Sequence, residues 1–141
     1  MINTITSAIS KAISTAFLDC EIYKEPTEQN AVDNSFFIQH NQTVTSGKTS
    51  GAREYRHLFS VTYYPQLENE NSLMNGATMK LVPILETLKI NDEWSMHGFS
   101  LTATKSEHLL SVTVEYRTIN YEEADGEPIN KTELNIITKE A

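Results

Sequence analysis

Apolar residues recur every three or four positions near the start of the chain, over residues 2–17. Polar side chains fill the positions between them, and this spacing predicts an amphipathic helix. Serine and threonine lower helix propensity, and isolated helices of this length are marginal in water. We therefore expect the helix to be stable only when its apolar face packs against the rest of the protein. That face consists of Ile2, Ile5, Ile9, Ala12, Ile13, Ala16 and Phe17.

A second helical pattern covers residues 70–88. Asn71 or Ser72 is placed to cap its first turn. Gly76 and Pro83 weaken the pattern, and Pro83 is expected to kink the helix or end its regular part, because proline lacks the N–H that the helix needs. The apolar stripe consists of Leu73, Ala77, Leu81, Ile84, Leu85 and Leu88.

Alternating apolar and polar positions predict the strands. The clearest strand covers residues 53–64 and ends at Pro65, since proline cannot donate to a strand ladder. Shorter strands are predicted at 21–24 and 35–40, and a hairpin at 94–104 and 107–118 with its turn near Lys105 and Ser106. One face of the 53–64 strand carries Tyr55, His57, Phe59, Val61 and Tyr63.

Two further segments lack a clear period. Residues 42–52 are rich in glycine, serine and threonine, which is typical of an exposed loop or of the flexible tip of a long hairpin. Residues 132–138 contain Leu134, Ile136 and Ile137, and they predict either a late strand or a tail that becomes ordered only against a partner.

The order of elements is helix, strands, helix, strands. This order predicts an α+β fold with a mixed or antiparallel β-sheet, two helices on one face, a long β-hairpin and a C-terminal extension. We expect residues 1–120 to form one domain and residues 121–141 to form the extension, which is a candidate strand between subunits.

Composition narrows the class of protein. The 141 residues suffice for one domain, no run of 18 apolar residues predicts a membrane span, and the start of the chain lacks the pattern of a signal peptide. A reducing cytosolic origin is the default expectation from this start. The single cysteine, Cys20, cannot form an internal disulfide and is expected to be a small buried apolar residue. The net charge of −8 argues against a tight grip on DNA or on an anionic membrane.

Candidate catalytic and cofactor motifs are weak. Residues 46–50 read Ser-Gly-Lys-Thr-Ser, but Gln42 stands where a phosphate-binding loop needs glycine, and a strand rather than a helix follows. The acidic clusters fall in predicted turns, where carboxylates are usually solvated. The four histidines show no metal-ligand spacing, although two of them can meet across a sheet. We therefore expect no enzyme activity, no metal and no cofactor.

Arg53, Tyr55 and Arg56 combine charge and aromatic rings at the start of the main strand. A nucleic-acid contact, a protein–protein contact and a plain solvated strand end are all open interpretations. The acidic chain favours the protein contact over nucleic acid, because arginine and tyrosine are enriched at interface hot spots.

The layout as a whole resembles the phage tail terminator family of phages, defective prophages and phage-tail-like bacteriocins of Gram-positive bacteria. The resemblance covers most of residues 1–118 and follows the isoleucine-rich helix. Its strand motifs are Ile-Tyr-Lys-Glu at 22–25, Ser-Phe-Phe-Ile at 35–38, Arg-Glu-Tyr-Arg at 53–56, Phe-Ser-Val-Thr-Tyr-Tyr-Pro at 59–65 and His-Leu-Leu-Ser-Val-Thr-Val-Glu-Tyr-Arg at 108–117.

The resemblance implies a structural subunit of a hexameric ring. Such a ring caps the tail tube, stops its polymerisation and presents a surface to the neck or head-completion protein, and in contractile tails it also holds the last sheath ring. The implied partners are other copies of the chain, the tube protein, the sheath protein and the neck protein. DNA only passes through the lumen, and the expected location is the virion tail after assembly in the host cytoplasm.

Two segments have little to contact in a monomer, namely the tip of the 35–64 hairpin and the 132–138 segment. We expect the tip to contact the next subunit or the tube, and the last segment to pair between subunits. The alternatives are another head–tail joining or neck completion protein and a small ligand-binding domain. The expected interface residues are Gly47, Lys48, Thr49, Gly51, Arg53, Tyr55, Arg56, Leu134 and Ile136.

Overall fold

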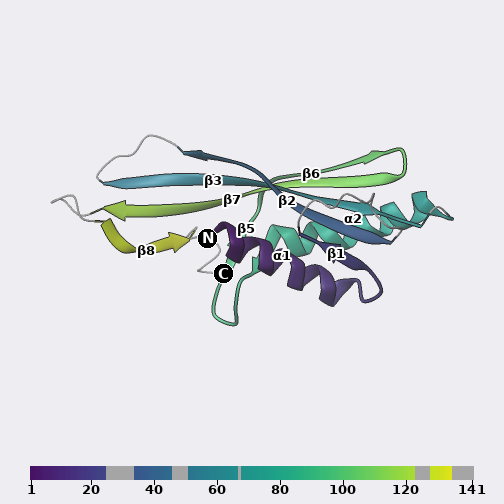
Figure 1. The fold of residues 1–141 in the computed structure, drawn as a ribbon, viewed down its shortest axis with the longest axis horizontal. Coiled ribbons are helices and arrows are strands. Elements are labelled where there is room, and N and C mark those ends of the chain that lie inside the picture. The colour runs from purple at the N-terminus through teal and green to yellow at the C-terminus, as the bar shows by residue number, and fades with distance from the viewer. Residues whose placement is uncertain (25–33, 46–50, 67, 123–127, 135–141) are drawn as a thin grey trace.

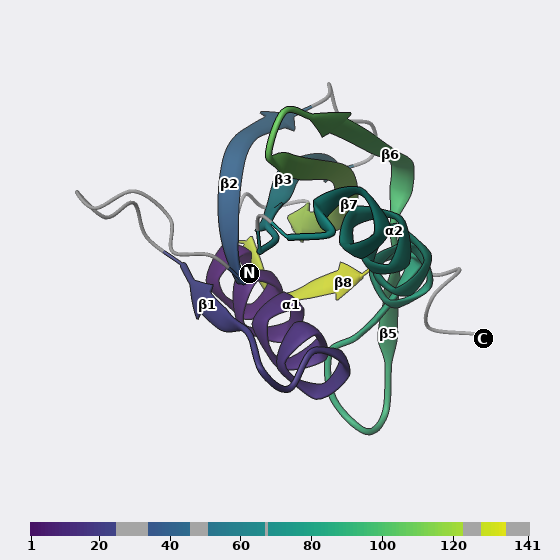
Figure 2. The same cartoon turned by 90° about the vertical axis from the view of Figure 1, so that its right-hand side faces the viewer.

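Two helices lie on one face of a mixed β-sheet in the computed structural model of the protein (Figures 1 and 2). The structure describes residues 1–24, 34–45, 51–66, 68–122 and 128–134. The α+β class with both helices on one face is confirmed. In chain order the elements are α1 (Ile2–Ala16), β1 (Glu21–Tyr23), β2 (Ser35–Thr45), β3 (Ala52–Tyr64), α2 (Glu70–Glu86), β4 (Thr87–Lys89), β5 (Ser95–His97), β6 (Phe99–Ser106), β7 (Leu109–Glu122) and β8 (Pro128–Leu134).

The sheet is built around the long strands β3 and β7, which pair antiparallel along almost their whole length. The strand order is β1-β2-β3-β7-β6, and β8 also pairs with β7. The β1 strand runs parallel to β2, while every other pair is antiparallel. One edge of β7 therefore serves two partners, β6 as far as Glu115 and β8 from Thr118 onward.

The core lies between the helices and the inner face of the sheet. The isoleucine stripe of α1 is fully buried at Ile5, Ile9 and Ile13, as its spacing predicts. Aromatic rings continue the core from the end of α1 to the sheet, with ring centroids 4.8 Å apart for Phe17 and Phe36. These contacts are the tertiary packing that a marginal helix needs.

The C-terminal end of α2 is tied to the sheet by two hydrogen bonds. The hydroxyl of buried Tyr116 donates to the Leu85 carbonyl at 2.7 Å, and the Gly98 N–H donates to the Glu86 carbonyl at 2.8 Å. Helix ends leave carbonyls without intrahelical partners, so these bonds satisfy groups that burial would otherwise make costly. Burial raises the pKa of Tyr116, which keeps its hydroxyl protonated as a donor.

Pro83 does not end the regular part of the helix, because α2 continues through it to Glu86. Both Pro83 and Met79, four residues earlier, are exposed. Because proline has no N–H, the Met79 carbonyl lacks its usual helical donor. This carbonyl lies on the solvated side of the helix, where water can replace the missing N–H. The helix begins at Glu70, as expected, but its cap residue is Asn69 at φ 64° in place of Asn71 or Ser72.

Two strand boundaries differ from the sequence prediction. Much of the 42–52 segment is strand, because β2 continues to Thr45 opposite Tyr55 and β3 begins at Ala52. Threonine suits a pleated, half-buried surface, so a polar stretch can extend a hairpin without an apolar period. The β6–β7 turn lies at Glu107 and His108 rather than at 105–106, with His108 at φ 69°.

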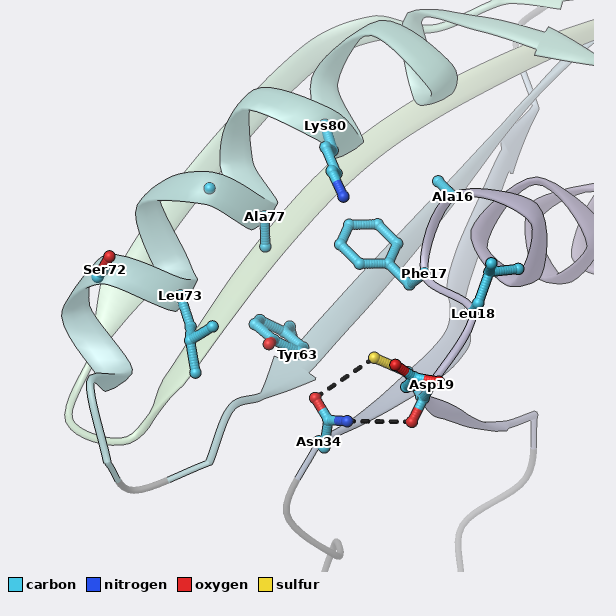
Figure 3. Close-up of a pocket in the computed structure, with 12 residues that line it drawn as sticks. Ala16, Phe17, Leu18, Asp19, Asn34, Tyr63, Ser72, Leu73, Ala77 and Lys80 are labelled. Carbon is cyan, nitrogen blue, oxygen red and sulfur yellow. Dashed lines mark hydrogen bonds between the residues drawn. The ribbon is translucent and has the colours of Figure 1, made fainter.

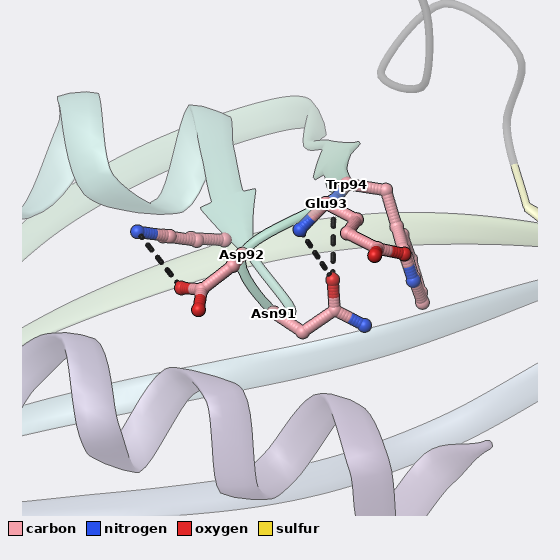
Figure 4. A network of polar contacts seen from close by, with 5 residues as sticks. Asn91, Asp92, Glu93 and Trp94 are labelled. Carbon is pink, nitrogen blue, oxygen red and sulfur yellow. Dashed lines mark hydrogen bonds and ion pairs between the residues drawn. The ribbon is translucent and has the colours of Figure 1, made fainter.

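A small two-stranded ladder of β4 and β5 follows α2, so the predicted 94–104 strand is divided. Its turn is shown in Figure 4. The Asn91 side-chain oxygen accepts the backbone N–H groups of Glu93 at 2.7 Å and Trp94 at 3.2 Å, and Lys89 lies 3.7 Å from Asp92. Asparagine thus shapes the turn, while both charged side chains of the ion pair stay exposed.

Replacing Gly98 by alanine is expected to destabilise the protein by about 1–3 kcal/mol. A Cβ atom there would lie 2.5 Å from the Leu85 carbonyl oxygen and 2.8 Å from a Val114 methyl group. Gly76→Ala is the matched control, since a Cβ at this position in α2 meets nothing within 4 Å. Alanine is a better helix former than glycine, so Gly76→Ala should be neutral or stabilising by up to about 1 kcal/mol. Urea unfolding of both variants measures the difference, and equal effects would contradict the packing described for Gly98.

Candidate assembly surface

At one end, the sheet extends beyond the two helices. We call this part of the sheet the arm. The arm comprises residues 41–45 of β2, 52–58 of β3, 115–122 of β7 and strand β8. Figure 1 shows these strand ends on the left, past the start of α1. Every strand of the arm pairs with its neighbour in antiparallel register, so the arm has β2 and β8 as its two edges.

Polar side chains replace the apolar core where the arm begins. The buried His57 ring hydrogen-bonds with the Thr43 hydroxyl at 2.9 Å through Nδ1 and with the buried Thr118 hydroxyl at 3.1 Å through Nε2. Thr43 also hydrogen-bonds with His40 at 2.8 Å. We call His40, Thr43, His57 and Thr118 the joint cluster. Both ring nitrogens of His57 have hydrogen-bond partners, so the ring is satisfied within the sheet.

The joint cluster holds His57 in its neutral form. Burial lowers the pKa of His57, and the positive charges of His40 and the N-terminal amino group lower that pKa further. Tyr55 lies on the side of His57 toward the tip, with the two rings nearly parallel and their centroids 6.3 Å apart. Protonation of His57 is therefore disfavoured at the point where helix cover ends.

The outer face of the arm, which no helix covers, carries two arginines side by side. Arg56 and Arg117 are direct partners across β3 and β7. The Arg117 guanidinium donates from Nε to a Glu115 carboxylate oxygen at 2.6 Å and lies 3.9 Å from the centre of the Phe99 ring. The Nε atom of Arg56 is buried and has no hydrogen-bond partner among the described residues. The two arginines therefore differ at Nε, which has an acceptor in Arg117 and none among the described residues in Arg56.

The structure separates the interface residues that the sequence grouped together. Strand alternation puts Arg53 and Tyr55 on the same face as His57, and Arg56 on the opposite face. Gly51 lies in a turn directly before β3 with φ 77°, a conformation that favours glycine. Leu134 is the last residue of β8 and pairs with Thr118. The predicted interface residues Gly47, Lys48, Thr49 and Ile136 lie outside the described residues.

A separate groove lies between the end of α1 and the start of α2 (Figure 3). Its volume is about 470 Å³, and it is lined by Phe17, Tyr63 and Leu73 among others. Two of its polar side chains have partners, because Lys80 lies 5.1 Å from the centre of the Phe17 ring and the Cys20 thiol donates to the Asn34 side-chain oxygen at 3.5 Å. Burial and Asp19 raise the pKa of Cys20 and keep it protonated, so the groove lacks an activated thiolate.

The described part of the chain shows two further features that bear on function. No group of three or more His, Cys, Asp or Glu side chains in these ranges is arranged to hold a metal ion. Across the same ranges, no helix is long and apolar enough to cross a membrane.

A family model described as phage tail terminator protein matches residues 4–128. The match covers α1 from residue 4 onward, all of α2 and every strand from β1 to β7. The chain belongs to this family. No curated protein matches it.

Family membership confirms the resemblance drawn from the strand motifs. The matched region of this terminator contains the joint cluster, both arginines of the outer face and the start of β8.

Sequence reasoning missed the joint cluster, although it expected that two histidines can meet across the sheet. The His40 and His57 rings do meet, with centroids 6.2 Å apart. The missing information was the strand register, which alone brings Thr43 and Thr118 to either side of His57.

The joint cluster predicts a pH dependence of stability in this terminator. The unfolded chain binds a proton at His57 with a pKa of about 6.5, whereas the folded chain has a lower pKa there. The unfolded state therefore takes up more protons as the pH falls below about 6.5, and the free energy of unfolding decreases. In His57→Gln, the loss of stability between pH 7.5 and pH 5.5 should be smaller than in the wild type.

His108 provides a control of opposite sign. A hydrogen bond of 2.9 Å to Glu70, and the charge of that carboxylate, raise the pKa of His108. The stabilisation that His108 contributes is fully present below the pKa it has in the unfolded chain. This stabilisation is lost as the pH rises through the higher pKa that His108 has in the folded chain. His108→Gln should therefore show a larger loss of stability on acidification than the wild type. Urea unfolding at both pH values tests the pair, and a His57→Gln profile equal to that of the wild type would contradict the neutral joint cluster.

Proposed function

We propose that this terminator assembles as a hexameric ring on the last ring of the tail tube, stops tube polymerisation and presents the surface to which the neck or head-completion protein binds. The match to the terminator family over residues 4–128 is the observation that supports this function. In a contractile tail, the same ring also holds the last ring of the sheath. The chain then acts as a structural subunit of the virion tail, assembled in the host cytoplasm.

Ring closure requires two different, complementary surfaces on each subunit. The arm supports this requirement, because it has two distinct sheet edges and an outer face with an incompletely bonded arginine. The net charge of −8 supports a ring through which DNA passes without binding. Copies of the chain, the tube protein, the neck protein and, in contractile tails, the sheath protein are the partners of this proposal.

Removal of the terminator gene from its phage or tail-like particle tests the function directly. Without the ring, tube polymerisation has no stop, so tails longer than those of the wild type are expected. Electron microscopy of the particles measures tail length, and restoring the gene in trans controls for effects on neighbouring genes. Tails of normal length in the absence of the gene would refute the proposed function.

Deletion of residues 47–51 tests the tip of the β2–β3 hairpin as a contact with the next subunit or the tube. Because the paired strands β2 and β3 remain, the subunit should still fold, while the yield of capped tails should fall about tenfold or more, which corresponds to about 1.4 kcal/mol of binding free energy. Asp92→Ala in the exposed β4–β5 turn is a matched change at another turn and should leave capping unchanged. Unchanged rings and tail lengths after the deletion would contradict a role for the tip.

A further inference from the structure

A leucine projects from the turn that joins α1 to β1. Leu18 is 83% exposed, which makes it the most exposed large apolar residue of the described ranges. Figure 3 shows its side chain directed away from Phe17 and Tyr63. Two exposed acidic residues flank it, because Asp19 follows directly and Glu21 begins β1. We call Leu18, Asp19 and Glu21 the Leu18 turn, which combines an apolar tip with negative charge.

A pocket of about 330 Å³ lies on another part of the subunit, between α1, the end of α2 and the β4–β5 turn. Figure 4 shows this turn facing α1. We call it the α1–β4 pocket. Its apolar lining includes Ala12, Ile84 and Ile90, which are all partly exposed. A cavity of about 150 Å³ already admits benzene, so the α1–β4 pocket has room for a leucine side chain. Leu18 of the same subunit does not line it.

The charges around the α1–β4 pocket are mainly positive, although the chain as a whole has a net charge of −8. Lys11 and Lys89 both line the pocket, together with one carboxylate, that of Asp92. Lys89 lies 3.7 Å from Asp92, whereas Lys11 is exposed and forms no ion pair within the described part of the chain. The pocket therefore combines an apolar lining with a basic rim, and it is complementary to the Leu18 turn in both respects.

This complementarity indicates a second copy of the chain as the occupant. An apolar tip that fits a pocket elsewhere on the same molecule makes a heterologous contact, and such a contact can close into a ring. The other strongly exposed apolar side chain, Met79, is 75% exposed but stands between Thr78 and Lys80. Met79 thus lacks the acidic neighbours that would match a basic rim.

We propose that the Leu18 turn of one subunit docks in the α1–β4 pocket of a second copy of the chain. The Leu18 side chain then packs on Ala12 of the partner subunit, and the Asp19 carboxylate lies beside Lys11 of the partner subunit. The proposal rests on the ring of the proposed function and names a contact between its subunits. This contact belongs to the helical body, so it is independent of the contact expected at the hairpin tip.

Substitution of the leucine tests the apolar part of the contact. Leu18→Gln should lower the yield of rings on assembled tails by about tenfold or more, while Met79→Gln is the matched control and should leave it unchanged. Ala12→Leu fills the pocket from within its own subunit and should lower the yield as Leu18→Gln does, because both residues are good helix formers. Urea unfolding verifies that each variant folds. Equal yields for Leu18→Gln and Met79→Gln would overturn the proposal.

A charge swap tests the polar part. At about 50 mM salt, Lys11→Glu and Asp19→Lys should each lower the ring yield by about threefold or more, and the double variant should recover at least half of the wild-type yield. At about 0.5 M salt the effect of each single reversal should shrink through screening, whereas the Leu18→Gln defect should persist. Lys105→Glu, at the exposed end of β6, controls for net charge. Equal defects in the double and single variants would overturn the ion pair.

Cross-linking tests which surfaces meet. In a Cys20→Ser background, tails assembled from a mixture of Leu18→Cys and Lys89→Cys subunits should give dimers with a short bifunctional thiol reagent, and tails of either variant alone should give none. Subunits with both substitutions should give a ladder of multimers up to the full ring. A dimer from Leu18→Cys alone, or a ladder that stops at the dimer, would show a symmetric pair and overturn the proposal.

The outcomes separate this contact from the terminator function. Wild-type rings that tolerate Leu18→Gln and give no mixed dimer would overturn the contact while the terminator function stands. Wild-type tails that carry no terminal ring of this chain would refute the proposed function itself.

Discussion

The hydrogen bond from the Tyr116 hydroxyl to the Leu85 carbonyl is the contact on which the division of the sheet depends. It satisfies the end of α2 inside the core and fixes that end against the middle of β7. The approach is possible because Gly98 has no side chain to separate the helix end from the sheet. On one side of Tyr116 the inner face is apolar and covered by helices. On the other side, two residues along β7, Thr118 begins the polar joint cluster. The end of α2 thus lies close to the level at which the inner face of the sheet changes from apolar to polar.

Much of this fold could be predicted from side-chain periodicity alone. The stripe of Ile5, Ile9 and Ile13 indicated a buried helix, and the alternation around Phe59 and Val61 gave the central strand and its buried face. Boundaries were less predictable where hydrogen bonding rather than hydrophobicity decides them. Residues 42–45 have no apolar pattern and extend β2 through pairing with β3, while Pro83 is tolerated because that side of α2 is exposed.

The candidate surface was predictable only in part, for a similar reason. Composition favoured a protein contact over a nucleic-acid contact for Arg53, Tyr55 and Arg56, and this stays a prediction, but composition cannot show that strand alternation places Arg56 on the other face. The difference between Arg56 and Arg117 is also invisible in the sequence, because it depends on which arginine reaches Glu115 and Phe99. Whether residues 121–141 form a separate extension stays a prediction, although β7 continues across residue 120 and β8 returns to pair with it.

The interruption in β2 and the change of partner along β7 occur at the same level of the sheet. The register of β2 shifts between His40 and Gln42, opposite Phe59 and Leu58. One strand further, Glu115 is the partner of Leu58 and also the last residue of β7 that pairs with β6. At this level only the β3–β7 ladder is uninterrupted. Bending at the level of Leu58 and Glu115 therefore strains fewer continuous ladders than bending elsewhere in the arm, so this level is where the arm can tilt with the least disturbance of backbone pairing.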